Sequence, residues 1–401
     1  MDNARLNRLK RRRAIWLQIH LWIGLSMGVL FSVVGITGSI SVFYQELDQW
    51  LNPGVLSVAP DPRGVSAYRP LQEILDAASK VAFPQDRRSG IQPPRVNDST
   101  YGIGYVRPAN KVLSTPETWV SVRVNPYTAQ VTGTRTFPLD AGFPPGLIDF
   151  IAVLHYRLLL DDFWGGSAVG ILGLVGLFSL LTGIILWWPL TGKWYRAFTF
   201  KWPANKKRIN VDLHKLTGIY LCVVIGPVFL SGVYMNFNSQ FVGLIQVISP
   251  NTNKVPIVNY NASKPNIGIA KAMQIATQAY PDGEPNWMAD ENENGVYLIS
   301  RRHVSGTSRF WAERVVTIEA QTGKILNVRD ATTRKTAGET FLDWQWPLHS
   351  GKAFGWTGRI LVFLSGLALP ALFVTGVIRW LQKRRSEKYS EQHREKLTNY
   401  V

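Results

Sequence analysis

The chain has 401 residues, of which 46% are hydrophobic, and its 44 lysines and arginines exceed its 27 acidic residues to give a net charge of +17. The excess positive charge lies in three short segments, 1–13, 189–215 and 377–401, whereas the long segments 45–165 and 236–350 are nearly neutral. Nucleic-acid binding requires a basic folded domain, so this distribution excludes it.

Apolar residues gather in four stretches, each long enough to cross about 30 Å of hydrocarbon as a helix that rises about 1.5 Å per residue. These stretches are residues 14–43, 166–188, 213–235 and 355–380. The first follows basic residues, as in a signal peptide, but it is too long and is not followed by a small-residue cleavage site. We therefore expect a membrane protein with four spans, the first of them uncleaved, surrounded by lipid.

The positions of the basic segments predict the orientation of the spans, because short basic segments remain in the cytoplasm. Both termini are then cytoplasmic, and the two long loops lie on the outer side of the membrane. The expected boundaries are 1–44 for the N-terminus and first span, 45–142 for a first external domain, 143–190 for an external helix and second span, 191–212 for a cytoplasmic loop, 213–236 for the third span, 237–340 for a second external domain, 341–381 for an external segment and fourth span, and 382–401 for a cytoplasmic tail.

The two long loops have the same predicted order of elements. Each begins with an amphipathic helix that ends at an aromatic-proline pair, and short segments of alternating hydrophobicity follow. The helices are expected at 71–84 and 267–281, and the strands at 101–106, 119–124 and 130–134 in the first loop and at 295–300, 313–318 and 324–328 in the second. We expect two small α+β domains. Neither contains a disulfide, because the single cysteine, Cys222, lies in the third span.

The two halves of the chain match each other at an offset of 194 residues. His20 matches His214 and His155 matches His349, and the neighbouring residues Gly24 and Gly218 agree as well. Because each half contains two spans, both halves cross the membrane in the same sense. The sequence therefore predicts a parallel internal repeat.

The predicted external domains resemble a known family. A helix, a strand, a turn such as Asn125-Pro126-Tyr127-Thr128 or Ala320-Gln321-Thr322-Gly323, and a further strand are similar to a PepSY domain. Two such domains among four spans, from about Ala14 to Trp380, resemble the PepSY-associated transmembrane proteins. The better understood members are haem-containing inner-membrane reductases of ferric siderophores, so the resemblance implies this activity. Some relatives end in a flavin-binding reductase domain, but this sequence ends about twenty residues after its last span. We therefore expect a separate electron donor, cytoplasmic or a quinol.

The matched histidines are the candidate metal ligands. The topology places His20 and His214 near the cytoplasmic face, and His155 and His349 near the outer face. Two imidazoles that face each other across a helical bundle can occupy both axial positions of a b-type haem, so we expect two such haems. Taken singly, a histidine within a span can instead be a hydrogen-bond partner or an interfacial residue.

Other residues are candidates for contacts with the haem or the chelate. Gly24 and Gly218 would leave room for a flat macrocycle one turn from a ligand, although glycines at this spacing also mediate helix packing. Arg157 and Arg359 could bind haem propionates. The residues expected to line a docking surface for the chelate are Trp344, Trp346 and Arg302.

The favoured function is therefore a membrane reductase that transfers electrons through two haems to an external ferric siderophore and releases Fe(II). The alternatives are a regulatory or binding module, because PepSY domains also accompany peptidases, and a siderophore transporter without redox activity. A transporter would be expected to have broken helices or polar residues at mid-membrane depth, and these spans contain few. No motif for hydrolysis, ATP use or dinucleotide binding is found.

Overall fold

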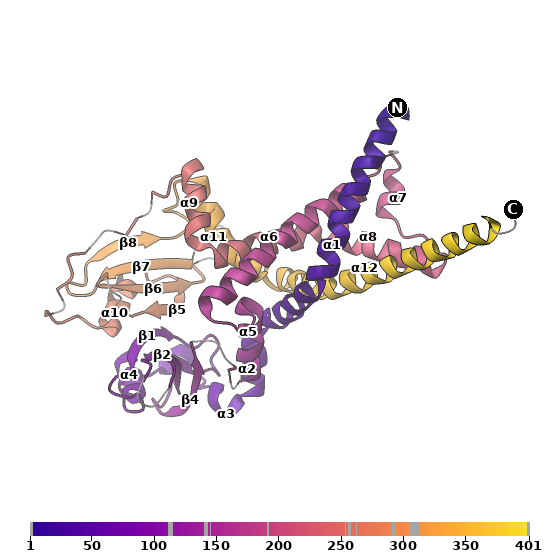
Figure 1. Cartoon of the computed structure of the whole chain (residues 1–401). Coiled ribbons are helices and arrows are strands. Elements are labelled where there is room, and N and C mark those ends of the chain that lie inside the picture. The colour runs from indigo at the N-terminus through magenta and orange to yellow at the C-terminus, as the bar shows by residue number, and fades with distance from the viewer. Residues whose placement is uncertain are drawn as a thin grey trace.

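The computed structural model describes residues 3–110, 115–139, 143–144, 146–190, 192–252, 254–255, 258–261, 263–290, 294–304 and 313–398. A bundle of long helices occupies one end of the molecule and a β-sheet the other (Figure 1). Four of the helices are long and apolar enough to cross a membrane, as the sequence predicted. They are α1 (Asn3–Ser41), α6 (Asp162–Trp187), α8 (Lys206–Asn236) and α12 (Gly355–Thr398).

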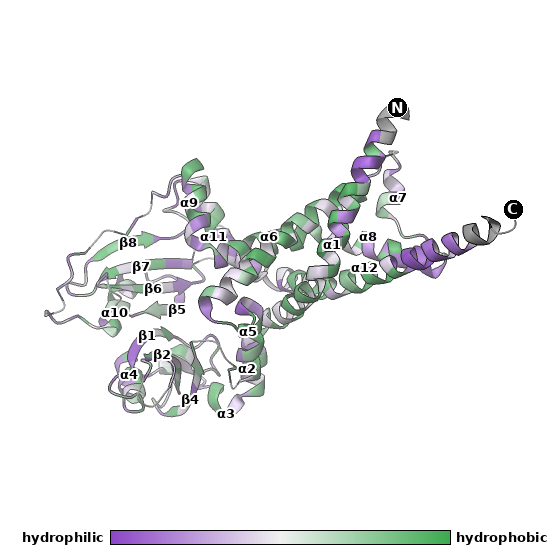
Figure 2. Ribbon diagram, viewed as in Figure 1, coloured by the Kyte–Doolittle hydropathy of each residue, from purple (hydrophilic) through white to green (hydrophobic). Residues whose placement is uncertain are grey.

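Small residues allow these helices to approach closely. Gly35 on α1 faces Gly366 on α12, where a Cβ atom on Gly35 would lie 2.5 Å from the Gly366 carbonyl oxygen. Close by, the Ser39 hydroxyl donates to the carbonyl of Phe363 at 2.7 Å. Apolar residues cover the middle of the bundle, and hydrophilic residues begin toward the free ends of α1 and α12 (Figure 2). Both termini and α7 (Trp194–Phe198) lie at the end of the bundle away from the sheet.

The sheet is a single antiparallel layer of eight strands in the order β4-β3-β2-β1-β5-β6-β7-β8. The strands are β1 (Arg87–Gln92), β2 (Tyr101–Arg107), β3 (Thr118–Val124), β4 (Val131–Pro138), β5 (Glu284–Ala289), β6 (Val296–Arg302), β7 (Glu313–Glu319) and β8 (Ile325–Arg329). Helices α4 (Leu71–Ser79) and α10 (Ile269–Ala279) pack on it, and one apolar core includes residues of both halves. Ile74 and Ile103 in the first half and Ile299 and Ile318 in the second are completely buried.

This continuous sheet joins the strands of the two expected α+β domains. Strands β1 and β5 join the halves by pairing Gly90 with Ala289 and the buried Ile91 with the buried Met288. Neither strand was expected, because β1 contains two arginines and a glycine, and β5 contains a proline, which are poor strand formers. Each strand gains a partner on both sides, and this tertiary pairing outweighs local propensity.

Short helices connect the bundle to the sheet. They are α2 (Tyr44–Leu51), α3 (Pro53–Leu56), α5 (Leu147–Arg157), α9 (Asn238–Ile248) and α11 (Ala337–His349), with 3-10 turns at Gly64–Ala67 and Lys352–Phe354. The helix expected before the second span and the segment expected before the fourth correspond to α5 and α11. Helix α5 packs against α1, and α11 packs against α8. These two contacts place a histidine from each short helix against a long one.

Candidate functional site

Four histidines form two facing pairs inside the bundle. His20 on α1 lies opposite His214 on α8, with ring centres 6.3 Å apart, and we call these the inner pair. His155 on α5 lies opposite His349 on α11, with ring centres 6.1 Å apart, and we call these the outer pair. Thr37 Oγ1 lies 3.5 Å from Nδ1 of His155, and Thr37 is on α1, 17 residues after His20. The two pairs are therefore about 25 Å apart along that helix. The structure thus brings together the residues that the sequence had paired.

Hydrogen bonds from neighbouring spans fix the rings of the inner pair. His20 Nδ1 lies 2.9 Å from Thr182 Oγ1, and His214 Nδ1 lies 2.9 Å from Thr375 Oγ1. The hydroxyl of Thr182 donates to the Ser179 carbonyl and that of Thr375 to the Ala371 carbonyl, so each threonine oxygen accepts from the imidazole. Nδ1 therefore carries the proton, and Nε2 has the lone pair needed to bind a metal.

The outer pair is held in the same way by backbone carbonyls. Nδ1–H of His155 donates to Val34 O at 2.9 Å, and Nδ1–H of His349 donates to Val228 O at 3.0 Å. These acceptors are 194 residues apart, as the two histidines are. Among the described residues, every hydrogen bond of the four rings is made by Nδ1. The donor set is therefore two pairs of neutral imidazoles, each with Nε2 available.

A glycine lies beside each of the four rings. A Cβ atom on Gly38 would lie 2.6 Å from Cε1 of His155, and one on Gly232 would lie 3.6 Å from Cε1 of His349. For the inner pair, Gly183 faces His20 and Gly376 faces His214, with corresponding distances of 3.3 and 3.5 Å. The absence of a side chain at these positions allows each ring to lie close to the backbone of the next helix.

The spacing of the rings fits a metal between them. Two metal–nitrogen bonds of about 2 Å, with about 1 Å more from each nitrogen to its ring centre, give about 6 Å between ring centres. The observed distances are 6.3 and 6.1 Å. Within the part of the chain that the structure describes, no group of three or more His, Cys, Asp or Glu side chains could hold a metal ion. Two imidazoles suffice for a haem, which brings four nitrogens of its own, whereas a bare zinc ion takes about four protein ligands.

A cavity of about 570 Å³ adjoins the inner pair, and we call it the inner cavity. Its volume lies in the range of about 300 to 1,000 Å³ that is usual for cofactor sites. Gly24 and Gly218 line it as expected, and a Cβ atom on Gly24 would meet no atom within 4 Å. Gly28 also lines it but contacts the ring of Phe373. The cavity therefore offers open space beside both rings of the inner pair.

Sequence reasoning missed the basic residues of the inner cavity, which are Lys10, Arg13, Lys215 and Arg379. Arg13 donates to the carbonyls of Leu186 and Trp188 at the end of α6. In the sequence, these residues indicate only the orientation of the spans. Arg379 carried a usable signal, since it is the one charged residue in the predicted span 355–380 apart from Arg359. Such residues can bind the carboxylates of a haem.

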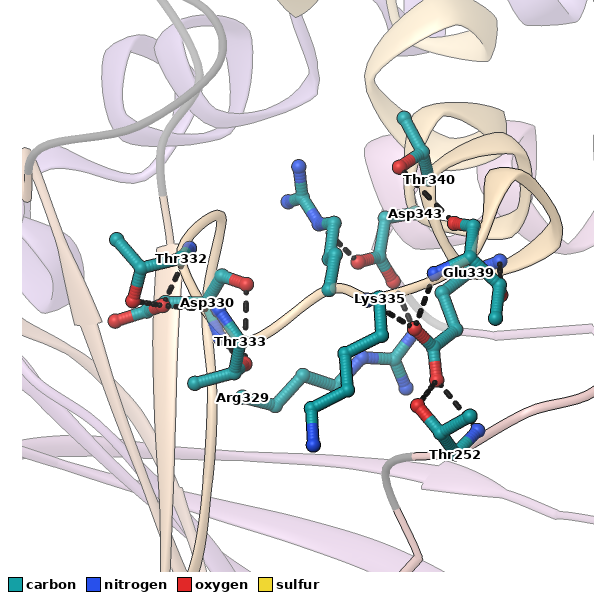
Figure 3. A network of polar contacts seen from close by, with 11 residues as sticks. Thr252, Arg329, Asp330, Thr332, Thr333, Lys335, Glu339, Thr340 and Asp343 are labelled. Carbon is teal, nitrogen blue, oxygen red and sulfur yellow. Dashed lines mark hydrogen bonds and ion pairs between the residues drawn. The ribbon is translucent and has the colours of Figure 1, made fainter.

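Helix α11, which carries His349, is anchored to the sheet by a polar network (Figure 3). A capping box at Thr336 and Glu339 begins the helix, and Glu339 also accepts from the backbone N–H of Thr252 at 2.6 Å. Asp343, one turn further on, accepts from Arg329 at the end of β8 and from Arg334. The sheet edge thereby fixes the helix whose last residue is His349.

Helix α5, which carries His155, has an equivalent anchor. Arg135 on β4 binds Asp149 on α5 and Asp48 on α2, and Tyr44 donates to Asp149 at 2.7 Å. Burial and the charge of Asp149 raise the pKa of the Tyr44 hydroxyl, which keeps it protonated as a donor. Arg135 and Arg329, like Asp149 and Asp343, are 194 residues apart.

The remaining predicted residues lie in different surroundings. Arg157 is buried and donates to Leu139 O and to Asp162 at the start of α6, so these contacts account for its position without a propionate. Arg359 donates to Val42 O and binds Glu46. Trp346 and Arg302 line a second cavity, whereas the ring of Trp344 lies 6.4 Å from that of Phe354. The propionate role of Arg157 and Arg359 stays a prediction.

Comparison with known proteins supports the overall architecture. The family model described as the PepSY-associated TM region matches residues 17–383, which include all four paired histidines. No curated protein matches the chain. Since the matched segment covers nearly the whole chain and the four long helices lie within or overlap it, the chain belongs to the family of PepSY-associated transmembrane proteins.

Proposed function

We propose that the chain is a membrane reductase that holds two b-type haems and delivers electrons to a ferric siderophore outside the membrane. The observation that carries this proposal is the pair of facing histidines at each end of the bundle, with Nδ1 anchored and ring centres about 6 Å apart. Haem, when bound, would supply reversible one-electron chemistry.

Side chains of the protein would hold the haems and shape their surroundings. The histidines would hold the iron, and the apolar residues around the inner pair would exclude water from it. Lys10, Arg13, Lys215 and Arg379 would hold the propionates of the inner haem. Two matched sites, made of residues 194 positions apart, support an internal repeat of parallel sense.

Reduction serves iron release for a chemical reason. Hard oxygen donors hold Fe(III) far better than Fe(II), so one electron added to each Fe(III) weakens its complex. The electron would come from a donor at the opposite face, a flavoprotein or a quinol, which is oxidised in return. A regulatory PepSY module and a siderophore transporter remain the alternatives, and neither explains why four histidines are matched in pairs.

Orientation follows from the charges and the arrangement of the ends. The termini and the basic 189–215 loop would face the cytoplasm of a bacterium, and the sheet would lie in the periplasm. Reporter fusions after residues 140, 200, 330 and 401 test this orientation. We expect external signals at 140 and 330 and cytoplasmic signals at 200 and 401. An external signal at 200 would overturn it.

The haem proposal is tested on the purified full chain. Protein from haem-replete cells should show a Soret band that shifts with dithionite, and pyridine haemochrome quantitation should give two haems per chain. His214→Ala should remove the inner haem, and His349→Ala the outer one, while His303→Ala, which alters an unpaired histidine, should retain both. A colourless wild-type protein would contradict the proposal and favour the regulatory module or the transporter.

The activity is tested in vesicles with an added external ferric siderophore. His349→Ala should abolish its reduction, because the outer pair lies at the sheet end of the bundle, while the inner haem should still accept electrons from the opposite side. If the variant lacks the outer haem yet reduces the siderophore at the wild-type rate, delivery through the outer pair must be abandoned.

A further inference from the structure

A second cavity, of about 1010 Å³, lies between the sheet and the bundle, and we call it the outer cavity. Its wall includes residues of β6, α11 and the first turn of α12, and the first half of the chain contributes Gln45 and Arg95. It is at the upper end of the range of about 300 to 1,000 Å³ that is usual for small-molecule sites. The outer cavity can therefore accept a large ligand.

The carboxylates on the wall of the outer cavity already have partners. Asp343 binds Arg329 and Arg334, and Asp330 binds Arg314. Glu313 accepts from Trp287 Nε1 at 2.6 Å and from Asn286 at 3.0 Å. The negative charge on the wall is thus matched or hydrogen-bonded within the protein.

Four further cations surround the same space: Arg95, Arg302, Lys352 and Arg359. Arg302 and Arg359 each have one acidic partner, Glu284 and Glu46, whose side chains are 57% and 50% exposed and therefore screened by water. The Arg95 guanidinium donates to the neutral Gln45. The positive charges of Arg302 and Arg359 repel that of Arg95, and an anion bound in the cavity would offset this repulsion.

The start of helix α12 adds to the positive potential. Gly355, the first residue of this long helix, lies on the wall of the outer cavity, and the N-terminus of a helix carries a partial positive charge. Aromatic surface lies beside it, since Trp287, Trp346 and Trp356 also line the cavity. The exposed fractions of Trp346 and Trp356 are 50% and 63%, so both can contact a ligand. Flat indole rings of this kind stack on aromatic ligand groups.

We propose that the outer cavity binds a polyanionic metal chelate with aromatic donor groups, of the tris-catecholate type, in preference to an uncharged chelate of similar size. This inference rests on the proposed reductase function and names its substrate class. The cavity is well placed, because Trp346 precedes His349 on α11 by three residues, which is about one helical turn or about 5 Å.

Binding is tested separately from electron transfer by using gallium(III), which is not reduced under these conditions. The full chain in phosphatidylcholine nanodiscs is titrated calorimetrically with a gallium-loaded synthetic tris-catecholate, which is trianionic, and with a gallium-loaded tris-hydroxamate, which is uncharged. We expect the trianionic complex to bind at least about tenfold more tightly, because it meets four cations, and the difference to shrink as salt is added.

Two variants assign this preference to the cavity. Arg95→Gln and Arg302→Gln should each weaken binding of the trianionic complex about tenfold and leave the uncharged one unchanged. Arg63→Gln, which alters a basic side chain that is 72% exposed, should change neither, and haem content with gel filtration verifies that each variant is folded. Equal binding of the two complexes, or a wild-type affinity in both cavity variants, would overturn the proposal.

Two further outcomes separate this inference from others. If phosphatidylglycerol nanodiscs abolish binding of the trianionic complex at constant ionic strength, the cavity is a lipid-headgroup site and the proposal is wrong. If a colourless protein still binds the trianionic complex, the reductase proposal is wrong and the anion-site proposal holds. If a haem-loaded protein binds neither complex, the anion-site proposal is wrong and the haem proposal holds.

Discussion

Each paired histidine uses its two ring nitrogens for different purposes. Nδ1 is fixed by a carbonyl or hydroxyl oxygen of a neighbouring span, and Nε2 is left for a ligand. Such a second contact sets the tautomer and the orientation of the ring before any metal binds. The rings are therefore positioned by the fold.

Gly24 offers the sharpest test of the inner cavity at single-residue scale. Gly24→Leu should fold, because a Cβ atom there meets nothing within 4 Å, but its side chain would occupy the space beside His20 and His214. We expect the haem content to fall from two to about one per chain by pyridine haemochrome, with the outer haem retained. The control is Gly54→Leu, where a Cβ atom is equally unobstructed but lies outside the cavity. Two haems in Gly24→Leu would contradict this placement.

A pH dependence is expected from Asp86 in the first half of the sheet. Arg107 donates to both of its carboxylate oxygens at 2.8 Å, and these hydrogen bonds hold the pKa of Asp86 below its usual value of 3.8. Because the folded pKa is depressed, the stabilisation is present above about pH 4 and is lost as the pH falls through the folded pKa.

Asp86→Asn should therefore destabilise the protein by about 1 kcal/mol at pH 7, and the difference from wild type should narrow below pH 4. Thermal unfolding at pH 7, 5 and 3 measures this difference. Arg69 and Glu73, which are both exposed, provide the matched control, since Glu73→Gln should change stability little at any pH. A difference that stays constant from pH 7 to pH 3 would refute the assignment.

At the scale of elements, the helices α5 and α11, which carry the outer pair, depend on the edge strands of the sheet. Arg135 on β4 and Arg329 on β8 each bind an aspartate on the following helix. In α11, His349 follows Asp343 by six positions, so movement at the anchor would reach the His349 ring within two turns. The sheet thus contributes to the geometry of the outer pair.

Asp343→Asn should loosen this anchor, because it removes the charge that binds Arg329 and Arg334. We expect a loss of about 1 to 2 kcal/mol in stability and lower occupancy of the outer haem, with the inner haem unchanged. Haem content and the redox titration of the outer haem provide the measurements. Asp76→Asn, which alters an exposed carboxylate on α4, should have no effect. If the inner haem were altered and the outer haem normal, the claim that Asp343 positions the outer pair would be wrong.

The elements that could be predicted are those with a strong local signal. The four spans, the helices α4 and α10 and six of the eight strands follow from hydrophobic periodicity. Strands β1 and β5 could not be predicted, because their signal is the partner strand about 200 residues away rather than their own composition. The four histidines were found from their matched spacing, whereas the acceptors Val34 O and Val228 O are backbone atoms, which any residue type would supply.

At the scale of the whole molecule, the sheet joins the two halves of the chain. The pairing of β1 with β5 is reinforced by the ion pair of Arg88 with Asp290, which also connects the halves. One apolar core extends under both halves. The outer cavity follows from this arrangement, since Gln45 and Arg95 come from one half and most of the wall from the other.

A disulfide across the joint tests this arrangement. In a Cys222→Ser background, the pair Gly90→Cys and Ala289→Cys should oxidise readily, because directly opposed residues of antiparallel strands have Cα atoms about 4.5 to 5.5 Å apart. Maleimide labelling with intact mass should find no free thiols after mild oxidation. Gly90→Cys with Asn327→Cys should keep two, since β8 lies three strands beyond β5 at about 4.8 Å per strand. Free thiols remaining in the Gly90→Cys and Ala289→Cys variant would show that β1 and β5 are not paired and that each half has its own sheet.

Helices α1 and α8 each contribute to both ends of the bundle. Helix α1 carries His20 and also Val34 and Gly38, which contact His155, while α8 carries His214 and also Val228 and Gly232, which contact His349. Each helix therefore fixes the distance between the inner and outer pairs. In a thicker or thinner bilayer the bundle would tilt or the lipid would deform, but the span between the pairs would stay constant. In the proposed reductase, the distance between the two haem sites is therefore set by the rise of two α-helices and is independent of the lipid around them.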